Sequence, residues 1–252
     1  MTEDSFDISV PADVESGQTL LIGMSHVGMA GLTAADYLVR HRPSEQIGHI
    51  TPDELPAITP FEDGIPRRHT RLYNLTDVDL TVLVGELFVP VWAARSFGDA
   101  LADWIGTNRI EEVALLYGVP FPHEPSEHET LYVASDTYRE RRLADTSFKP
   151  LKGGFLDGVA GELISRSIDG ELPPVGVYLT PTHPPGPDID AALTFLDAAE
   201  TIYGVKVDRT ELEERLEALR EYYANLADRL AAIEENDQLL GSRDYPDDRM
   251  YM

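Results

Sequence analysis

Short apolar runs alternate with amphipathic stretches along most of the chain. Thr19-Leu20-Leu21-Ile22-Gly23 is an apolar run closed by glycine, which is the pattern of a buried strand. Residues Ala30 to Leu38 follow with the apolar spacing of a helix that ends near Pro43. The chain is therefore predicted to begin its fold with a strand, a loop and a helix.

The same alternation continues through the next 165 or so residues and predicts an α/β fold. Further strands are predicted at Ile47–Thr51, His69–Tyr73, Leu80–Val84, Val113–Tyr117, Leu131–Ala134 and Val175–Thr180. Further helices are predicted at Trp92–Ile105, Leu156–Ile168 and Ile189–Tyr203. Near-continuous apolar strands separated by helices are typical of a largely parallel sheet with helices on both faces.

The chain has a different pattern after Val207. Asp208 and Glu211 form a capping box, and apolar residues then recur with 4,3 spacing, so a long helix is predicted over 208–236. Its narrow apolar seam fits either a helix on the domain's own sheet or a seam shared between subunits. Because the Pro- and Gly-rich passages are short enough to be loops, residues 1–237 are predicted to form a single α/β domain. Residues 238–252 are expected to be a flexible tail.

Charge narrows the classes of partner. The chain carries 45 Asp and Glu residues against 20 Lys and Arg, which gives a formal net charge of −25 at pH 7. Nucleic-acid binding requires a basic face, so a nucleic-acid partner is not expected. Self-repulsion of this size is relieved at molar salt, where the screening length is about 3 Å. We interpret the chain as one built for a high-salt cytosol; an acidic protein of ordinary cytosol is the alternative.

Composition also bears on location. The chain has no cysteine, which excludes disulfides and thiolate sites and fits a reducing compartment. No apolar stretch approaches the roughly 18 residues of a membrane span, and the first residues are acidic where a signal peptide would be basic. We therefore expect a cytoplasmic protein with no membrane association.

Two motifs that resemble ligand sites fail on spacing. The loop Gly23 to Gly31, "GMSHVGMAG", lacks the Lys and Ser/Thr of a P-loop and has His26 where a dinucleotide fingerprint needs glycine. Its glycines fit a tight turn and close packing of a helix on the sheet instead. In "HEPSEHE", His123 and His128 are five residues apart with Pro125 between them, so they do not share a helix face for zinc. No metal and no cofactor are therefore predicted.

Three polar residues remain as candidates for a cleft at the carboxyl ends of the strands. Glu86 follows the apolar strand that ends in Gly85, where an open α/β sheet places functional carboxylates. His26 lies in the first glycine loop next to Ser25, but the chain has no G-x-S-x-G elbow to make Ser25 a nucleophile. Asp188 closes "HPPGPD", which is most simply a rigid loop with Asp188 capping the next helix.

The segment Met250-Tyr251-Met252 is apolar although it follows a polar, acidic stretch. A terminal carboxylate preceded by a phenol and an apolar side chain can enter a narrow pocket that offers a cation, a polar partner and an apolar wall. One such tail binds weakly, but several tails on one oligomer act together through effective concentration. These three residues are therefore predicted to bind a partner.

Several stretches together resemble the proteasome assembly chaperone two family of archaea. They are "LLIGMSHVGMAGLTAADYLV", "DLTVLVGE", "VALLYGVP", "GGFLDGVAGELI" and "PGPDIDAALTFLDAAETIYGVKVD", which run in order from about residue 17 to the charged helix. The resemblance implies a nucleoside-phosphorylase-like topology, homo-oligomerisation, no established catalytic activity and a partnership with the 20S proteasome. It also implies a hydrophobic-Tyr-any terminus that docks between α-subunits, matched here by Met250, Tyr251 and Met252.

Two functional hypotheses follow. The first is a proteasome-interacting protein, an assembly chaperone or an ATP-independent activator, that docks on the 20S α-ring through Met250, Tyr251 and Met252. The alternative is a nucleosidase- or phosphorylase-like enzyme acting on a small nucleoside-type substrate, with His26, Glu86 and Asp188 as its available groups. The alternative rests on the inferred fold alone, which is an analogy.

Overall fold

The computed structural model describes residues 6–11, 14–53, 55–56, 58–120, 128–183, 186–219 and 221. The chain divides into two compact units, Met1–Asp208 and Arg209–Met252. In the second unit residues 210–219 and 221 are helical. The rest of the helix predicted over 208–236 and the tail 238–252 lie outside the described residues. No helix in the described residues is both long and apolar enough to cross a membrane.

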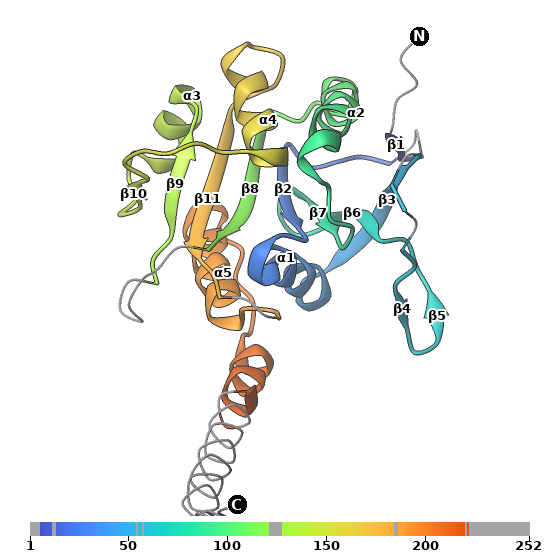
Figure 1. Ribbon diagram of the computed structural model, residues 1–252, viewed down its shortest axis with the longest axis vertical. Coiled ribbons are helices and arrows are strands. Elements are labelled where there is room, and N and C mark those ends of the chain that lie inside the picture. Colours follow the sequence, from blue (N-terminus) through green and yellow to red (C-terminus); the bar gives the residue numbers. More distant parts are fainter. Residues whose placement is uncertain are drawn as a thin grey trace, which may run out of the picture. The chain divides into compact units, whose positions relative to one another are not determined.

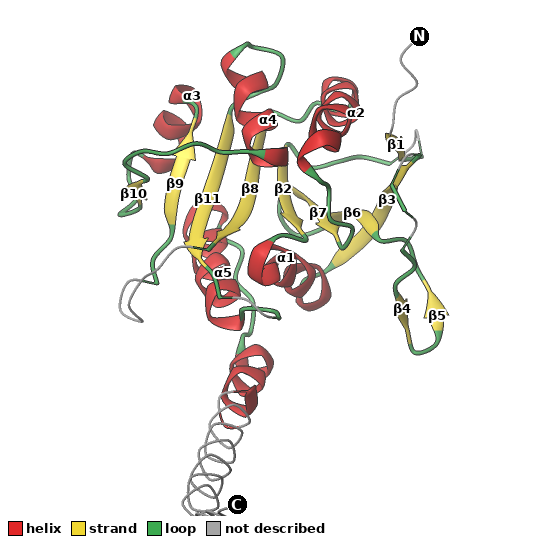
Figure 2. Cartoon of the chain, in the orientation of Figure 1, coloured by secondary structure: helices red, strands yellow, loops and turns green. Residues whose placement is uncertain are grey.

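The first unit alternates strands and helices in the predicted order (Figures 1 and 2). Its strands are β1 Phe6–Ser9, β2 Thr19–Met24, β3 Ser44–Pro52, β4 Phe61–Glu62, β5 Ile65–Pro66, β6 Thr70–Leu75, β7 Leu80–Gly85, β8 Glu112–Val119, β9 Leu131–Ala134, β10 Lys149–Pro150 and β11 Val175–Pro181. Its helices are α1 Ala30–His41, α2 Ala94–Thr107, α3 Asp136–Tyr138, α4 Gly158–Ile168 and α5 Ile189–Tyr203. A π-helical turn, Arg139–Leu143, directly follows α3.

Within the described residues, nine strands form one sheet in the order β1-β3-β6-β7-β2-β8-β11-β9-β10. The four central strands, β7, β2, β8 and β11, are parallel to one another, as predicted. The strands next to this centre, β6 and β9, are antiparallel to it, because β6 pairs with β7 and β9 pairs with β11 in the opposite sense. The sheet is therefore mixed, with a parallel centre, rather than parallel through most of its width.

Helices cover both faces of the parallel centre (Figure 1). The chain moves one way along the sheet from β2 through α1, and the other way from β7 through α2 and from β8 through α4. When two right-handed crossover connections lead in opposite directions across a sheet, their helices lie on opposite faces of the sheet. Accordingly α1 packs beside α5, and α2 packs beside α4. Buried side chains on the two sides include Leu38 and Phe195 on one and Phe97 and Leu163 on the other.

The glycine loop between β2 and α1 allows close packing, as its spacing predicted. Gly28 has φ +70°, and a Cβ there would lie 2.6 Å from the Cβ of Thr182. A Cβ on Gly31 would lie 2.2 Å from the carbonyl oxygen of Leu116 in β8. Both distances are far inside van der Waals contact, so these two positions accept only glycine without movement of the backbone around them.

Candidate functional site

A cleft opens at the carboxyl ends of the parallel strands, where open α/β sheets hold ligands. Its volume is about 170 Å³. The loop after β2, the loop after β7, strand β8 and the start of α4 form its walls. We call it the β2–β8 cleft, and its lining residues are Met24, Ser25, His26, Phe88, Val89, Val91, Leu115, Leu116, Tyr117, Asp157, Gly158 and Val159.

His26 stands in this cleft as a neutral imidazole. Its Nδ1 lies 2.9 Å from the carbonyl oxygen of Gly118, and because a carbonyl only accepts, Nδ1 carries the proton. Burial lowers the pKa of His26, while the Gly118 carbonyl and the Asp157 charge act in the opposite direction. Its ring packs on Tyr117 with centroids 4.1 Å apart. The ring is therefore held in one tautomer, which leaves a lone pair on Nε2.

Tyr117 links the cleft floor to a carboxylate on its rim. The Tyr117 hydroxyl donates to Oδ1 of Asp157 at 3.2 Å. Burial, reinforced by the Asp157 charge, raises the pKa of Tyr117 far above its usual value, so the phenol stays protonated and remains a donor. Asp157 occupies the N-cap position of α4, yet its side chain makes no capping hydrogen bond. An aspartate at this position normally accepts a hydrogen bond from the first turn of the helix, whereas Asp157 accepts from Tyr117 instead.

Of the three residues predicted for a cleft, His26 lines it and the other two do not. Glu86 follows β7 as expected, but its Oε1 is bound by Arg67 at 2.7 Å and by Arg71 at 3.2 Å. Asp188 caps α5 by accepting from the backbone N–H of Ala191 at 3.0 Å, as predicted. The grouping of His26, Glu86 and Asp188 in one cleft is therefore corrected, because two of these carboxylates are engaged by groups outside it.

The chemistry that the cleft offers is hydrogen bonding rather than nucleophilic attack. The N–H of Ser25 donates to the carbonyl of Gly85, and within the described residues no hydrogen bond joins Ser25 to His26. The same part of the chain contains no cluster of three or more His, Asp or Glu side chains able to hold a metal ion. What remains is a neutral imidazole acceptor, a carboxylate and aromatic walls.

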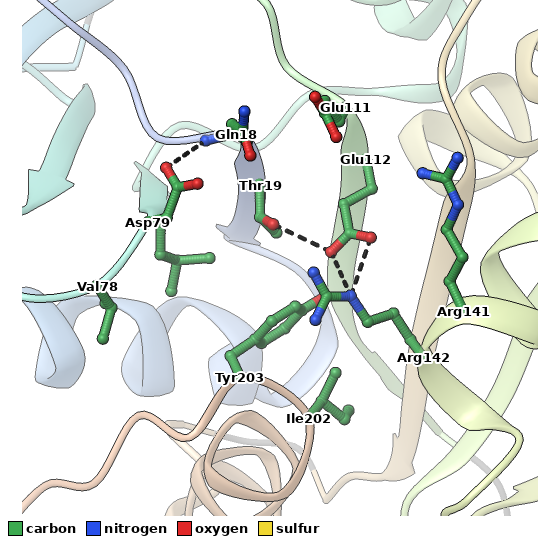
Figure 3. Close-up of a pocket in the computed structure, with 11 residues that line it drawn as sticks. Gln18, Thr19, Val78, Asp79, Glu111, Glu112, Arg141, Arg142, Ile202 and Tyr203 are labelled. Carbon is green, nitrogen blue, oxygen red and sulfur yellow. Dashed lines mark hydrogen bonds and ion pairs between the residues drawn. The ribbon is translucent and has the colours of Figure 1, made fainter.

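A second pocket, of about 320 Å³, lies at the opposite end of the strands, where β2, β7 and β8 begin (Figure 3). Glu112 at the start of β8 is 3% exposed and receives Nε of Arg142 at 2.8 Å and Oγ1 of Thr19 at 3.0 Å. Asp79 in its wall accepts from the backbone N–H of Gln18 at 2.8 Å. The buried charges of this pocket are thus matched inside the protein, unlike the acceptors of the β2–β8 cleft.

The sequence analysis did not predict the residue pairs that form the β2–β8 cleft and the second pocket. Tyr117 and Asp157 are 40 residues apart, and Glu112 and Arg142 are 30 apart, so no local spacing joins them. The available signals were a polar residue at the end of a buried strand and an acid before a helix. The predicted partner-binding residues Met250, Tyr251 and Met252 lie outside the described residues.

Comparison with known proteins identifies a family that this chain matches. The model of the PAC2 family matches residues 20–227 of the chain. No curated protein sequence matches it.

Solved structures share the fold over nearly the whole chain. Pyrococcus furiosus PbaA, an archaeal homolog of proteasome-assembly chaperone, has a TM-score of 0.80 at 18% identity, covering 94% of this chain and 97% of its own. P. furiosus PbaB, an archaeal proteasome activator, has a TM-score of 0.74 at 18% identity, covering 89% and 100%. A PAC2 family protein from Streptomyces avermitilis has a TM-score of 0.65 at 20% identity, covering 83% and 96%. At these identities the likeness concerns the fold.

Proposed function

The chain belongs to the PAC2 family, and from this premise we propose that it is a proteasome-interacting protein, either an assembly chaperone or an ATP-independent activator. The observation that carries the proposal is the family match over residues 20–227. The match in fold to an archaeal homolog of proteasome-assembly chaperone and to an archaeal proteasome activator agrees with it. Both of these structures are named for a role at the proteasome, and neither is named as an enzyme.

The proposed contact is the segment Met250-Tyr251-Met252, which would dock between α-subunits of the 20S ring. Its terminal carboxylate would meet a cation, the phenol of Tyr251 a polar partner and the side chain of Met250 an apolar wall. Ordering one such tail costs conformational entropy, so a single tail binds weakly. We propose a homo-oligomer, whose several tails engage one α-ring together and raise the effective concentration of each.

Removal of residues 250–252 tests the proposed contact. Binding of the full-length chain to purified archaeal 20S particles in molar KCl, followed by pull-down and negative-stain microscopy, is compared with that of the shortened chain. We expect the shortened chain and Tyr251→Ala to lose binding, and Met252→Leu to keep it, because the last side chain is the variable position. Equal binding by the full-length chain, the shortened chain and Tyr251→Ala would remove the tail from the mechanism.

The two proposed roles differ in the particle on which the protein acts. An activator raises peptide hydrolysis by mature 20S particles without ATP. An assembly chaperone leaves that rate unchanged and increases the yield of mature particles from separately expressed α- and β-subunits. Measuring the hydrolysis rate and the particle yield with the same preparation assigns the role. Light scattering of that preparation gives its subunit number.

The enzyme alternative has weaker support. A nucleosidase- or phosphorylase-like enzyme would need His26, Glu86 and Asp188 as its available groups. Glu86 is instead bound by two arginines, and Asp188 caps a helix. The related structures are named as a chaperone homolog and an activator.

A cytoplasmic, high-salt setting is part of the proposal, because the net charge of −25 is best tolerated there.

A further inference from the structure

The β2–β8 cleft holds two hydrogen-bond acceptors that the protein leaves unused. Nε2 of His26 has a lone pair, because Nδ1 carries the ring proton. Asp157 accepts from Tyr117 through Oδ1 only. Within the described residues neither Nε2 of His26 nor Oδ2 of Asp157 makes a hydrogen bond. A ligand that fits the cleft should therefore supply donors.

The size of the cleft fits a single ring. Its volume of about 170 Å³ is close to the roughly 150 Å³ of an engineered apolar cavity that binds benzene. Drug-sized ligands occupy pockets of roughly 300 Å³ or more. The volume of the cleft is therefore that of about one ring of a ligand.

Two aromatic rings in the cleft stand at a spacing suited to a sandwich. The rings of His26 and Phe88 are nearly parallel, with an interplanar angle of 28° and centroids 6.5 Å apart. A flat ring in contact with both needs about 7 Å, twice a carbon contact distance of roughly 3.5 Å. Phe88 is 54% exposed, so it can shift by the small difference. His26 also packs on Tyr117, with ring centroids 4.1 Å apart.

Charge selects among flat rings. Asp157 provides a carboxylate at the rim, and the whole chain carries a formal net charge of −25. A phosphate group near Asp157 would be repelled, whereas a neutral or cationic ring is favoured. A carboxylate can accept more than one N–H group, so a ring that carries an amino group is favoured over a phenol, which has one donor.

We propose that the β2–β8 cleft binds one flat nitrogen heterocycle of the aminopyrimidine or aminopurine kind. Its ring stacks between His26 and Phe88, and its N–H groups donate to the carboxylate of Asp157. The proposal concerns the β2–β8 cleft alone and does not depend on the proteasome or on residues 250–252. It assigns binding, and no chemical step.

Calorimetric titration of the full-length chain with matched probes tests the site. The pair 2-aminopyrimidine and pyrimidine have the same ring and differ in the exocyclic amine. Adenosine and adenosine monophosphate differ in the phosphate alone. We expect saturable binding of 2-aminopyrimidine and adenosine, and binding at least about tenfold weaker for pyrimidine and the monophosphate, since one charged hydrogen bond corresponds to about that factor. Equal affinities within both pairs, or no binding by any probe, would overturn the proposal.

Variants locate the binding. Asp157→Asn keeps the side-chain shape and removes the charge, and Phe88→Ala removes one wall of the sandwich; each should weaken 2-aminopyrimidine by about tenfold. Asp103→Asn on the exposed side of α2 makes the same change of charge away from the cleft and should leave affinity unchanged. If all three variants bind alike, the probe binds elsewhere and the proposal fails. Phe88 is largely exposed, so its variant is expected to fold.

The ring has two potential sources, a free heterocycle or an aromatic side chain of a protein partner, and one further arm separates them. N-acetyltryptophanamide and N-acetyltyrosinamide present such side chains with their peptide groups. We expect them to bind more weakly than 2-aminopyrimidine, because each ring has a single donor. Tighter binding by either amide, with displacement of 2-aminopyrimidine, would overturn the assignment to a free heterocycle.

Discussion

Arg142 is the sole charged partner of the buried carboxylate of Glu112 within the described residues, with Nε 2.8 Å from Oε1 and 3.0 Å from Oε2. The two residues come from the π-helical turn after α3 and from the first position of β8 (Figure 3). Their ion pair thus fixes the irregular turn to the centre of the sheet. A π-helical turn re-aims side chains relative to an ordinary helix, which here directs Arg142 toward the strand end.

Arg142→Met should destabilise the fold more than Glu112→Gln. Loss of Arg142 leaves a buried carboxylate with Thr19 as its remaining donor, which we expect to cost about 2–3 kcal/mol. That figure is below the usual cost for fully buried pairs because Arg142 is partly exposed. Urea unfolding of each variant and of the double variant gives the coupling energy. Arg141→Met, one residue away on the exposed surface, serves as the control and should change stability little.

If Arg142→Met and Arg141→Met are equally stable, the pair contributes nothing to the fold. A double variant that recovers stability relative to Arg142→Met would show that the cost comes from the unpaired carboxylate.

Gly31→Ala should destabilise the protein, and Gly106→Ala should stabilise it. A Cβ on Gly31 would meet the carbonyl oxygen of Leu116 at 2.2 Å, which forces α1 away from β8 and should cost about 1–3 kcal/mol. A Cβ on Gly106 in α2 would have no heavy atom within 4 Å, so helix propensity alone should add about 0.5–1 kcal/mol. Thermal melting of the two variants gives both signs. Equal shifts in the same direction would contradict the close approach of α1 and β8.

The order of the helices and strands could largely be predicted from the sequence. The antiparallel direction of β6 and β9 was not predicted. An apolar run marks a strand but carries no direction. The connection between β6 and β7, Thr76 to Asp79, is too short for a crossover and therefore requires a hairpin. This length was available in the sequence and would have predicted the antiparallel edge.

The candidate site was readable only in part. The strand-end argument placed Glu86 after β7, and the glycine loop after β2 carries His26, which lines the β2–β8 cleft. The strand-end argument did not foresee that Arg67 and Arg71, from the preceding loop and strand, bind Glu86. Such pairs form between segments distant along the chain, and their distances depend on register and side-chain packing rather than on local spacing. For the same reason Tyr117 and Asp157 carried no local signal of their contact.

Three hydrogen-bonded tyrosines, Tyr138 and Tyr178 buried and Tyr203 partly buried, should make the fold sensitive to alkali. The hydroxyl of Tyr138 is hydrogen-bonded to those of Tyr178 and Tyr203, and burial raises the pKa of each of the three. Below pH about 10 the folded and unfolded chains both keep these protons, so the full stability is present. Above pH 10 the unfolded chain releases protons that the folded chain retains, so the free energy of unfolding falls as pH rises toward the folded pKa values.

Urea unfolding at pH 8 to 11 measures this dependence. Tyr138→Phe removes both hydrogen bonds and should cost about 1–3 kcal/mol at pH 8. It should also reduce the alkaline slope, by up to about 1.4 kcal/mol for each pH unit at the upper end of this range, because one fewer raised group contributes. Tyr132→Phe, in β9 and only partly buried, is the control and should leave the slope nearly unchanged. An unchanged slope in Tyr138→Phe would place the alkaline transition elsewhere.

Salt should raise the stability of this chain over a wide range. Carboxylates outnumber basic side chains by 45 to 20, and some ion pairs of the fold, such as Lys149 with Glu129, are exposed and weak. Raising KCl from about 0.1 M to about 1 M shortens the screening length from roughly 10 Å to 3 Å, which removes repulsion between neighbouring carboxylates while the buried Glu112–Arg142 pair is screened much less. The free energy of unfolding should therefore increase with KCl and level off near molar salt.

Unfolding by urea at several KCl concentrations, repeated in sorbitol at matched osmolality, separates screening from a general effect of cosolute on hydration. We expect KCl to stabilise more than sorbitol. The increase should be smaller in a variant in which Asp103, an exposed acid of α2, is changed to asparagine, because less repulsion remains to be screened. Stability that is flat between about 0.15 M and molar KCl would instead favour an acidic protein adapted to ordinary cytosol, and would remove the argument for a high-salt setting.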